Sequence, residues 1–310
     1  MVGGDDISWQ ELGRITREWA GDAAELTALL PLSGGSINNT LMLVTADDRK
    51  SVLKITPHRV NVQLEVEAFQ LTLLRDLGLP VPAVYQCHVA SLDNPNSYLL
   101  LEYCEGITLT EAKRRLAPEV YDGIQQQLAE LTARLHQHTR ENYGKVDASG
   151  NHQTPHWAGF YRSLHEHSLQ IAQQMTEIPI KVRKKLEKLH RRLEQFLAHG
   201  DQPRLCHGDL WGGNVICRQD ADGQWRITAI IDPNLRYGHA ESELAYMDLF
   251  ETSAAAFRRT YQQSHKLDED YHRVRKPIYQ LYPLINNVQL FGAKYVPALV
   301  KVAERATSFV

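Results

Sequence analysis

Apolar and polar residues follow two different periods in the first hundred residues. Strand-forming side chains fill 39–44 and 51–55, with a polar turn between them, and this pattern predicts a hairpin. Over 61–77 the apolar positions recur at helical spacing, and a glycine and a proline follow. Further strands are predicted at 83–89 and 97–103. We therefore expect a small lobe made of a sheet and one main helix.

Farther along the chain the pattern becomes mainly helical. Helices are predicted from Pro118 onward, over 157–175 and over 180–197. Short strands at 215–217 and 225–231 interrupt this run, and helices return toward the C-terminus. A chain of 310 residues is long enough for two lobes around a cleft.

These patterns predict an α+β fold with two domains. The N-terminal lobe, 1–104, is expected to hold a small antiparallel sheet with one main helix, and the larger lobe, 105–310, is expected to be mostly helical. Within the larger lobe, the loop 206–217 and the strand end 230–233 carry the residues with the clearest chemistry.

The loop contains His207-Gly208-Asp209-Leu210-Trp211-Gly212-Gly213-Asn214, and Asp232 follows the next predicted strand. Kinases use an Asp to orient the acceptor hydroxyl, and an Asn and a second Asp to hold the metal ions on the phosphates. The five-residue spacing from Asp209 to Asn214 matches a kinase catalytic loop. Asp209 or Asn214 alone could simply cap a turn, but the ordered set favours ATP- and Mg²⁺-dependent phosphoryl transfer.

A kinase also needs a lysine that binds the ATP phosphates and a glutamate that holds this lysine. Lys54 lies in a strand directly before the helix 61–77. Glu65 and Glu67 on that helix both qualify by position, and because they are two residues apart they cannot share one face. We predict Glu67 as the partner.

Two more segments are candidates for nucleotide binding. Gly34, Gly35 and Ser36 precede the hairpin and can cover phosphates with backbone N–H groups, although the spacing differs from that of protein kinases. Glu102 and Cys104 belong to the predicted lobe connection, whose backbone could bind adenine.

Charge and composition exclude several other classes. The net charge of −3 gives no general attraction to nucleic acid or to anionic lipid. The basic run 181–192 has helically spaced apolar positions, which favours the solvated face of a helix over a surface for an acidic partner. Neither a secretion signal nor a membrane-spanning stretch is evident, so a cytoplasmic location is predicted. The four cysteines form no CxxC pair and are expected to be buried in strands.

The chain resembles the fructosamine kinases, or ketosamine kinases, within the aminoglycoside and choline kinase-like group. The resemblance is carried by 207–214, by Asp232-Pro233, by 237–245, and by the stretch from 279 to 292. It covers nearly the whole chain and implies the protein-kinase-like two-lobe fold. It also implies that the acceptor is the sugar of a ketosamine, free or protein-bound, whose phosphorylated form decomposes and releases the amine.

The resemblance assigns roles to individual residues. Asp209 is implied to be the catalytic base, Asn214 and Asp232 the Mg²⁺ ligands, and Lys54 with Glu67 the pair that orders the ATP phosphates. Trp211 and His239 are implied to contact the substrate.

The sequence also departs from the family pattern and leaves alternatives open. A Pro-Gln-x-Asn element usual in the family is replaced at 151–157, so substrate contacts from this segment cannot be transferred. A kinase for an aminoglycoside or an amino alcohol is the nearest alternative, and a nucleotide-binding scaffold without activity is a third. The sugar and the oligomeric state stay open.

Overall fold

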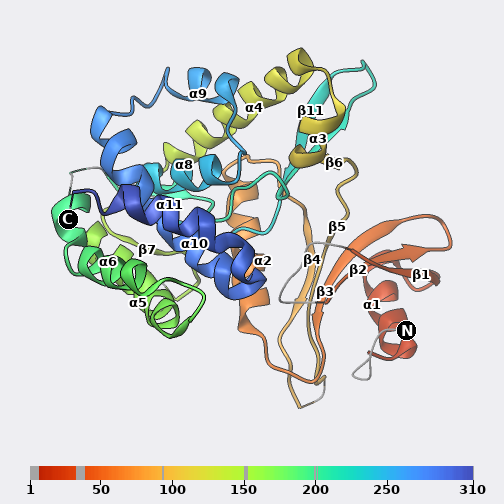
Figure 1. The fold of residues 1–310 in the computed structure, drawn as a ribbon. Coiled ribbons are helices and arrows are strands. Elements are labelled where there is room, and N and C mark those ends of the chain that lie inside the picture. Colours follow the sequence, from red (N-terminus) through yellow and green to blue (C-terminus); the bar gives the residue numbers. More distant parts are fainter. Residues whose placement is uncertain are drawn as a thin grey trace. The chain divides into compact units, whose positions relative to one another are not determined.

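The structure is a computed structural model that describes residues 7–32, 39–92, 94–149, 153–198, 200 and 202–309. The chain divides into two compact units. The first contains Met1–Ala112 and Gly213–Pro233, and the second contains Lys113–Gly212 and Asn234–Val310. The hairpin after the catalytic loop therefore packs within the first unit, whereas the predicted division assigns it to the helical lobe. Figure 1 labels the elements of both units.

The first unit is built on a five-stranded antiparallel sheet with the order β1-β2-β3-β5-β4. Its strands are β1 (Leu26–Pro31), β2 (Asn39–Thr45), β3 (Lys50–Thr56), β4 (Val84–His88) and β5 (Ser97–Glu102). The predicted hairpin is formed by β2 and β3, and the two later predicted strands are β4 and β5. The strand β1 lies at one edge and was not predicted.

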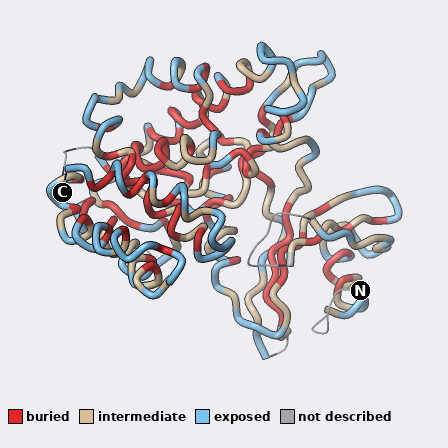
Figure 2. The backbone as a smooth tube through the Cα atoms, viewed as in Figure 1, coloured by how far each residue is buried: buried red, intermediate tan, exposed pale blue. Residues whose placement is uncertain are grey.

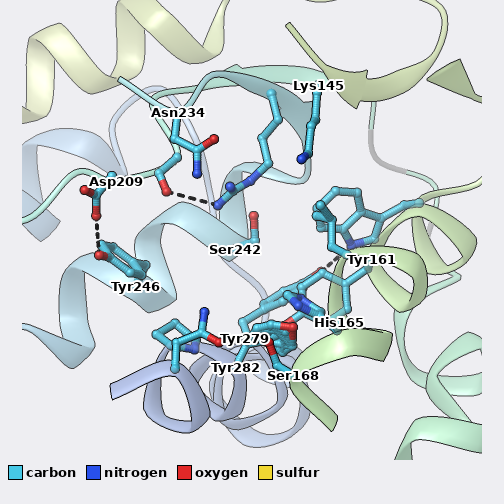
Figure 3. A pocket seen from close by; sticks show the side chains of 16 residues that line it. Lys145, Tyr161, His165, Ser168, Asp209, Asn234, Ser242, Tyr246, Tyr279 and Tyr282 are labelled. Carbon is cyan, nitrogen blue, oxygen red and sulfur yellow. Dashed lines mark hydrogen bonds between the residues drawn. The ribbon is translucent and has the colours of Figure 1, made fainter. Parts of the chain in front are cut away.

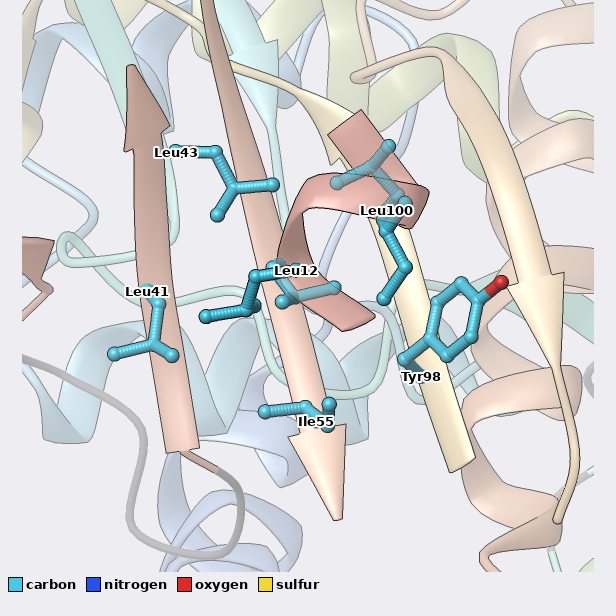
Figure 4. Packing of buried hydrophobic residues seen from close by; sticks show 8 residues of the cluster. Leu12, Leu41, Leu43, Ile55, Tyr98 and Leu100 are labelled. Atoms are coloured by element: carbon cyan, nitrogen blue, oxygen red, sulfur yellow. The ribbon is translucent and has the colours of Figure 1, made fainter. Parts of the chain in front are cut away.

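Two helices pack on this sheet: α1 (Trp9–Ala20) and α2 (Val62–Asp76). Leu12 and Ile15 of α1 pack on alternate residues of three strands, and Figure 4 shows Leu12 among these residues. These strand residues are Leu41 and Leu43, Leu53 and Ile55, and Tyr98 and Leu100. Each fully buried apolar side chain of this size contributes about 1.5–3 kcal/mol, so the cluster fixes which face of the sheet α1 covers.

The alternation along β3 decides where its lysine points. Because Leu53 and Ile55 face α1, Lys54 between them must face the opposite side of the sheet. The helix α2 packs against β4 and β5, and it buries Leu64 and Leu71. A lysine in this position is thereby directed toward a helix that carries a glutamate.

A second, smaller sheet of the first unit has the order β11-β10-β6. It contains β6 (Ile107–Thr108), β10 (Val215–Gln219) and β11 (Trp225–Ile230). The backbone N–H of Ile231 donates to the carbonyl of Asn214 at 3.0 Å, directly beyond the last paired residues. The open end of this hairpin is therefore next to both predicted metal ligands, Asn214 and Asp232.

The second unit is mostly helical. Its longer helices are α4 (Pro118–His136), α5 (Trp157–Gln174), α6 (Ile180–Arg191), α8 (Ala240–Leu249), α10 (Lys276–Phe291) and α11 (Val296–Ala306). Shorter helical segments are α7 (Leu193–Leu197), α9 (Ala255–Tyr261), the π-helix η1 (Tyr271–Arg275) and the 3₁₀ turn η2 (Ala293–Tyr295), while α3 (Leu109–Arg115) crosses the boundary between the units.

Four very short strands form the sheet of the second unit, in the order β8-β7-β12-β9. They are β7 (Tyr143–Lys145), β8 (Gln153–Thr154), β9 (Arg204–Cys206) and β12 (Arg236–Gly238). In Figure 2 the helices α8 and α10 are drawn largely as buried, whereas α6 shows an exposed face. Because α6 buries Val182, Leu186 and Leu189 and exposes most of its basic residues, the reading of its basic run as a solvated face is confirmed.

The predicted class, a small antiparallel sheet with a helix and a larger helical part, is confirmed. The prediction of four buried strand cysteines is partly wrong. Cys87 is exposed, and Cys104 is half-buried and follows β5 instead of lying in a strand. Cys206 and Cys217 are buried in strands as predicted. Among the described residues, no helix combines the length and apolar character needed to cross a membrane.

Candidate active site

Lys54 lies in a cluster of charges within the first unit. Its Nζ is 2.6 Å from Oε1 of Glu67 on α2, and it also contacts Oδ1 of Asp232. Glu67 thus occupies the position expected for the partner of Lys54, while Glu65 is exposed. Three residues distant in sequence therefore meet through β3, α2 and the end of β11.

The electrostatics of this cluster are those of a buried cation between two carboxylates. Burial by itself lowers the pKa of Lys54, but Glu67 and Asp232 raise it above 10.5, so the side chain stays protonated. Burial raises the pKa of Glu67, and the charge of Lys54 opposes this shift. The cluster depends on all three charges, because removing one partner from a buried ion pair leaves an uncompensated charge.

The two predicted metal ligands, Asn214 and Asp232, lie at the same end of the β10–β11 hairpin. The bond from the N–H of Ile231 to the carbonyl of Asn214 ties the two chain segments together there. Asp232 has a φ of 56°, in the left-handed region that is costly for a residue with a side chain. An amide oxygen and a carboxylate are hard oxygen donors of the kind that Mg²⁺ prefers, so these residues fit such an ion.

Asp209, the predicted catalytic base, belongs to the second unit. Its Oδ1 accepts a hydrogen bond from the hydroxyl of Tyr246 on α8. Burial and the neighbouring Asp209 carboxylate raise the pKa of Tyr246 well above 10, so its hydroxyl keeps its proton and remains a donor. Figure 3 shows the two side chains directed toward each other at one end of a cavity.

The backbone of the catalytic loop is held by Glu243, which is also on α8. Its Oε1 accepts from the N–H of Gly208 at 2.6 Å, and its Oε2 accepts from the N–H of His207 at 3.2 Å. His136 Nε2 lies 2.9 Å from Oε2, and Tyr261 lies on the other side of the imidazole, 2.7 Å from its Nδ1. A buried carboxylate thus connects α4, α8 and the loop.

These contacts decide the charge of Glu243. Burial raises the pKa of this carboxyl, but the hydrogen bonds from His136 and from the loop outweigh it and hold the pKa below the usual 4.5. Cys206 brings its sulfur within 4.8 Å of the ligand atoms of His136 and Glu243. Because both of these residues already have hydrogen-bond partners in the protein, we interpret the group as a structural network.

Gly208 is required by the local geometry. Its φ is 84°, and a Cβ at this position would lie 2.0 Å from the carbonyl oxygen of Asn234. The N–H of Asn234 in turn donates to the carbonyl of His207 at 2.8 Å. The loop therefore passes so close to the segment after β11 that only glycine fits.

Asp209 lies in the wall of a cavity of about 380 Å³ within the second unit. The cavity is lined by aromatic side chains, by hydroxyl and amide groups, and by two cations. The aromatic residues are Trp157 and Tyr161 of α5 and Tyr279 and Tyr282 of α10. Figure 3 shows Tyr279 and Tyr282 on the side opposite Asn234 and Lys145. This mixture of apolar and polar groups is typical of a small-molecule site.

The two predicted substrate residues lie outside this lining. His239 is completely buried behind the cavity wall, where its ring stacks on Trp157 with a centroid separation of 4.8 Å. Its ring nitrogens lie 3.1 Å and 3.2 Å from the hydroxyls of Tyr143 and Tyr279. His239 therefore supports the wall without reaching the cavity. Trp211 is on the loop, and 36% of its surface is exposed.

Of the two segments predicted to bind the nucleotide, the structure describes the one that contains Glu102 and Cys104. Gly34, Gly35 and Ser36 lie outside the described residues. Glu102 and Cys104 line a separate cavity of about 320 Å³ in the first unit. Glu102 Oε2 accepts from the N–H of Ala83 at 2.9 Å. Burial raises the pKa of Cys104 to about 11, so its thiol is not ionised at neutral pH.

Several residues of the site were missed by the sequence analysis. Glu243 and Tyr246 lie 35 and 37 residues after Gly208 and Asp209, the loop residues that they contact, and only the regular spacing along α8 connects them. Lys145 and Arg236 lie on three-residue strands, which leave no periodic signal. Of these four, Glu243 alone falls within a segment that carried the family resemblance.

A lysine–glutamate pair behind an antiparallel sheet, an amide and a carboxylate at a hairpin end, and an aspartate beside a polar cavity are the groups expected of a kinase of the protein-kinase-like fold. The model of the fructosamine kinase family matches residues 8–308. The chain belongs to the fructosamine kinase family.

Individual relatives agree with this assignment. A protein named as a probable ketoamine kinase, from Enterococcus faecium, is 28% identical over 276 residues, which is 86% of this chain and 91% of that protein. The chloroplastic protein-ribulosamine 3-kinase of Oryza sativa subsp. indica is 27% identical over 308 residues, or 93% of this chain and 82% of that one.

Solved structures show the same fold. A protein assigned as a fructosamine-3-kinase of Haemophilus somnus superposes with a TM-score of 0.75 and 24% identity, covering 96% of this chain and 97% of the other. A variant of an aminoglycoside phosphotransferase, solved with ADP and hygromycin B, has a TM-score of 0.67 and 17% identity, covering 97% and 100%. At these identities the similarity demonstrates the fold alone.

Proposed function

We propose that this chain transfers the γ-phosphate of ATP, with Mg²⁺, to a sugar hydroxyl of a ketosamine. The observation that carries the proposal is the arrangement of groups within each unit. The first unit brings Lys54, Glu67 and Asp232 together, and the second unit places Asp209 in the wall of a cavity large enough for a sugar adduct.

Lys54 is proposed to bind the phosphates of ATP, with Glu67 holding its ammonium in place. Asn214 and Asp232 would hold Mg²⁺, which when bound neutralises charge on the phosphates. Glu102 and Cys104 belong to the segment whose backbone is proposed to bind adenine. Gly34, Gly35 and Ser36 are proposed to cover the phosphates.

Asp209 is proposed to accept the proton of the acceptor hydroxyl. Its Oδ1 accepts a hydrogen bond from the Tyr246 hydroxyl, which helps to fix the orientation of the carboxylate. Glu243 fixes the backbone of His207 and Gly208, so the loop that carries Asp209 is anchored on α8. General-base catalysis of this kind contributes about 10²- to 10⁴-fold in rate.

The acceptor is assigned from the family. The names of the relatives specify ketoamines and protein-bound ribulosamines, and the cavity offers hydroxyl, amide and aromatic groups that suit a sugar. Trp211 remains a proposed substrate residue. His239 was expected to contact the substrate, but it is fully buried behind the cavity wall, so we propose instead that it supports Trp157 and Tyr279. The family resemblance implies that the phosphorylated adduct then decomposes and that the biological result is deglycation.

The test is ATP consumption with Mg²⁺ on ribulose-lysine, fructose-lysine, an aminoglycoside and choline. We expect turnover on a ketosamine, and a loss of about 10²- to 10⁴-fold for Asp209→Asn. Asp222→Asn, the same change on the exposed turn between β10 and β11, is the matched control and should leave turnover unchanged. Turnover on the aminoglycoside or choline alone would contradict the proposed acceptor. ATP binding without any turnover would favour the scaffold alternative.

A cytoplasmic location stays a prediction.

A further inference from the structure

Two cations of the Asp209 cavity are direct cross-strand neighbours. In the antiparallel pair β7–β12, Arg236 is the register partner of Lys145, and both side chains line the cavity. Directly opposite residues on one face of such a pair have Cβ atoms about 4.5–5.5 Å apart, and like charges in that arrangement destabilise the sheet. Lys145 is exposed and Arg236 is partly buried, so solvent screens part of this repulsion and the two cations lie side by side at the cavity wall.

The described part of the protein does not compensate these charges. Neither Lys145 nor Arg236 has a carboxylate of a described residue within 4.0 Å. Arg236 donates one hydrogen bond, from Nη2 to the carbonyl of Gly208 at 3.3 Å, which orients the guanidinium beside the catalytic loop. In Figure 3 the ammonium of Lys145 is directed into the cavity, on the side opposite Tyr279 and Tyr282.

The charge of Arg236 acts to lower the pKa of two other side chains of the cavity, His165 and Tyr161. Burial lowers the pKa of His165 well below 6.5, and the charge of Arg236 lowers it further, so this imidazole is neutral. Burial raises the pKa of Tyr161, and Arg236 opposes that shift. Asp209 is the only carboxylate among the residues that line the cavity, against two permanent cations. The described lining thus has a net positive charge.

We propose that the acceptor carries an anionic group, a carboxylate or a phosphate, that binds between Lys145 and Arg236. The inference rests on the proposed function for the identity of the acceptor and deepens it. The preferred substrates are then small ketosamines with a negative charge near the sugar, such as an adduct of an amino acid at its α-amine or an adduct of a phosphorylated sugar. A glycated lysine side chain inside a protein has no such charge.

The chemistry of the two side chains supports this assignment. A guanidinium presents paired N–H donors that match a carboxylate or a phosphate, and an ammonium adds a compact point charge. In an adduct of an α-amine the carboxylate is separated from the sugar by only a few bonds, so both fit one cavity of about 380 Å³. The same two cations disfavour polycationic acceptors, including aminoglycosides.

The first test compares matched acceptors. Fructose-glycine and fructose-glycinamide differ only in a carboxylate against a neutral amide, and a neutral fructosamine with and without a 6-phosphate forms a second pair. We expect kcat/KM to be at least about tenfold higher for the anionic member of one pair. The pair that shows the difference identifies the source of the anion. Equal values within both pairs would overturn the proposal.

The second test uses Lys145→Met, which keeps most of the length of the side chain and removes the charge. We expect it to lower kcat/KM for the preferred anionic acceptor about tenfold more than for the neutral one. Lys185→Met, at an exposed position of α6, removes the same charge elsewhere in the unit and should have no effect. An equal loss on both acceptors would contradict an anion subsite.

A binding measurement separates this inference from the proposed function. Calorimetric titration with fructose-glycine and with its amide needs no turnover, so it tests the subsite even if neither compound is phosphorylated. Tighter binding of the carboxylate, reduced about tenfold by Lys145→Met, supports the subsite. If Arg236→Gln lowers kcat equally for all acceptors and leaves both dissociation constants unchanged, Arg236 acts on the transferred phosphate, and the subsite between the two cations is excluded.

Discussion

At the scale of single residues, the hydrogen bond between Tyr246 and Asp209 is the contact nearest to the proposed chemistry. A donor to a carboxylate favours its ionised form and fixes its orientation. We expect Tyr246→Phe to lower kcat about tenfold, because the base loses its fixed geometry. The acid limb of the pH profile of kcat/KM should also move to higher pH.

The measurement is the pH dependence of ketosamine phosphorylation for both proteins. Phenylalanine keeps the ring contact with Phe250. A change in the pH profile therefore reports the loss of the hydroxyl and not a loss of ring packing. A variant with the wild-type kcat and an unchanged acid limb would show that the hydroxyl has no part in positioning Asp209.

Gly208 permits a second prediction from backbone geometry. Gly208→Ala would place a Cβ 2.0 Å from the carbonyl oxygen of Asn234 at a φ of 84°, so the loop must move or the residue must accept strain of at least about 1–2 kcal/mol. We expect loss of most activity and a lower melting temperature. Gly159→Ala is the control, because it lies in α5 with nothing within 4 Å of the added Cβ.

The control substitution, Gly159→Ala, should raise the stability of the protein instead of lowering it. Alanine in place of an exposed helical glycine stabilises by about 0.5–1 kcal/mol. Thermal unfolding and turnover of the two variants measure the contrast, and a Gly208→Ala protein with full activity would show that the close approach to Asn234 does not constrain the loop.

At the scale of elements, α8 determines the position of the catalytic loop through Glu243. Glu243→Gln replaces an acceptor of two backbone N–H groups by an amide, and we expect a loss of about 1–3 kcal/mol in the free energy of unfolding at neutral pH. Because the pKa of Glu243 is lowered in the folded protein, its contribution is complete above the usual value of 4.5. That contribution is lost as the pH falls through the lowered pKa.

The difference in stability between wild type and Glu243→Gln should therefore be largest near neutral pH and shrink in acid. Denaturant titrations at a series of pH values test this dependence. A difference that stays constant from neutral pH down through the acid range would indicate that the carboxylate charge of Glu243 does not stabilise the fold.

The elements that the sequence predicted are those with a long hydrophobic period. The helices α2, α4 and α5 and the strands β2 to β5 place apolar residues at regular spacing, and tertiary packing preserves that spacing. By contrast, α1 has a capping serine at Ser8 and a helical apolar face, so its signal was present and was missed.

The candidate site was predictable only in part, for a physical reason. Asp209, Asn214 and Asp232 lie close together in sequence, and their spacing is fixed by the chemistry. The proximity of Lys145 to Arg236 instead depends on the register of two short strands that are about ninety residues apart. Such pairings are decided by tertiary packing, which a local pattern cannot contain.

At the scale of the whole molecule, the two units carry different parts of the proposed reaction. The groups proposed for ATP and Mg²⁺, among them Lys54, Asn214 and Asp232, lie in the first unit. Asp209 and its cavity lie in the second. One of the points at which the chain passes between the units falls within the glycine pair Gly212-Gly213. Variants in the two units should therefore have separable effects on the two substrates.

Glu67 and Glu65 provide the sharpest test of this separation, because both lie on α2 and only Glu67 contacts Lys54. Glu67→Gln removes the charged partner of Lys54 on α2 and leaves it paired with Asp232 alone, so we expect ATP to bind more weakly and kcat/KM for ATP to fall about tenfold or more. Binding of a ketosamine to the second unit should be unchanged. Glu65→Gln, the same change at an exposed position, should behave like wild type.

Calorimetric titration of each variant with ATP and with the ketosamine measures both affinities separately. Asp209→Asn should differ from Glu67→Gln, because ATP affinity should be retained while turnover falls by about 10²- to 10⁴-fold. If Glu67→Gln weakened the ketosamine and ATP equally, or if Glu65→Gln had the same effect as Glu67→Gln, the Lys54–Glu67 pair would serve general stability and not nucleotide binding. The matched glutamates on α2 thus separate a role in the reaction from a role in folding.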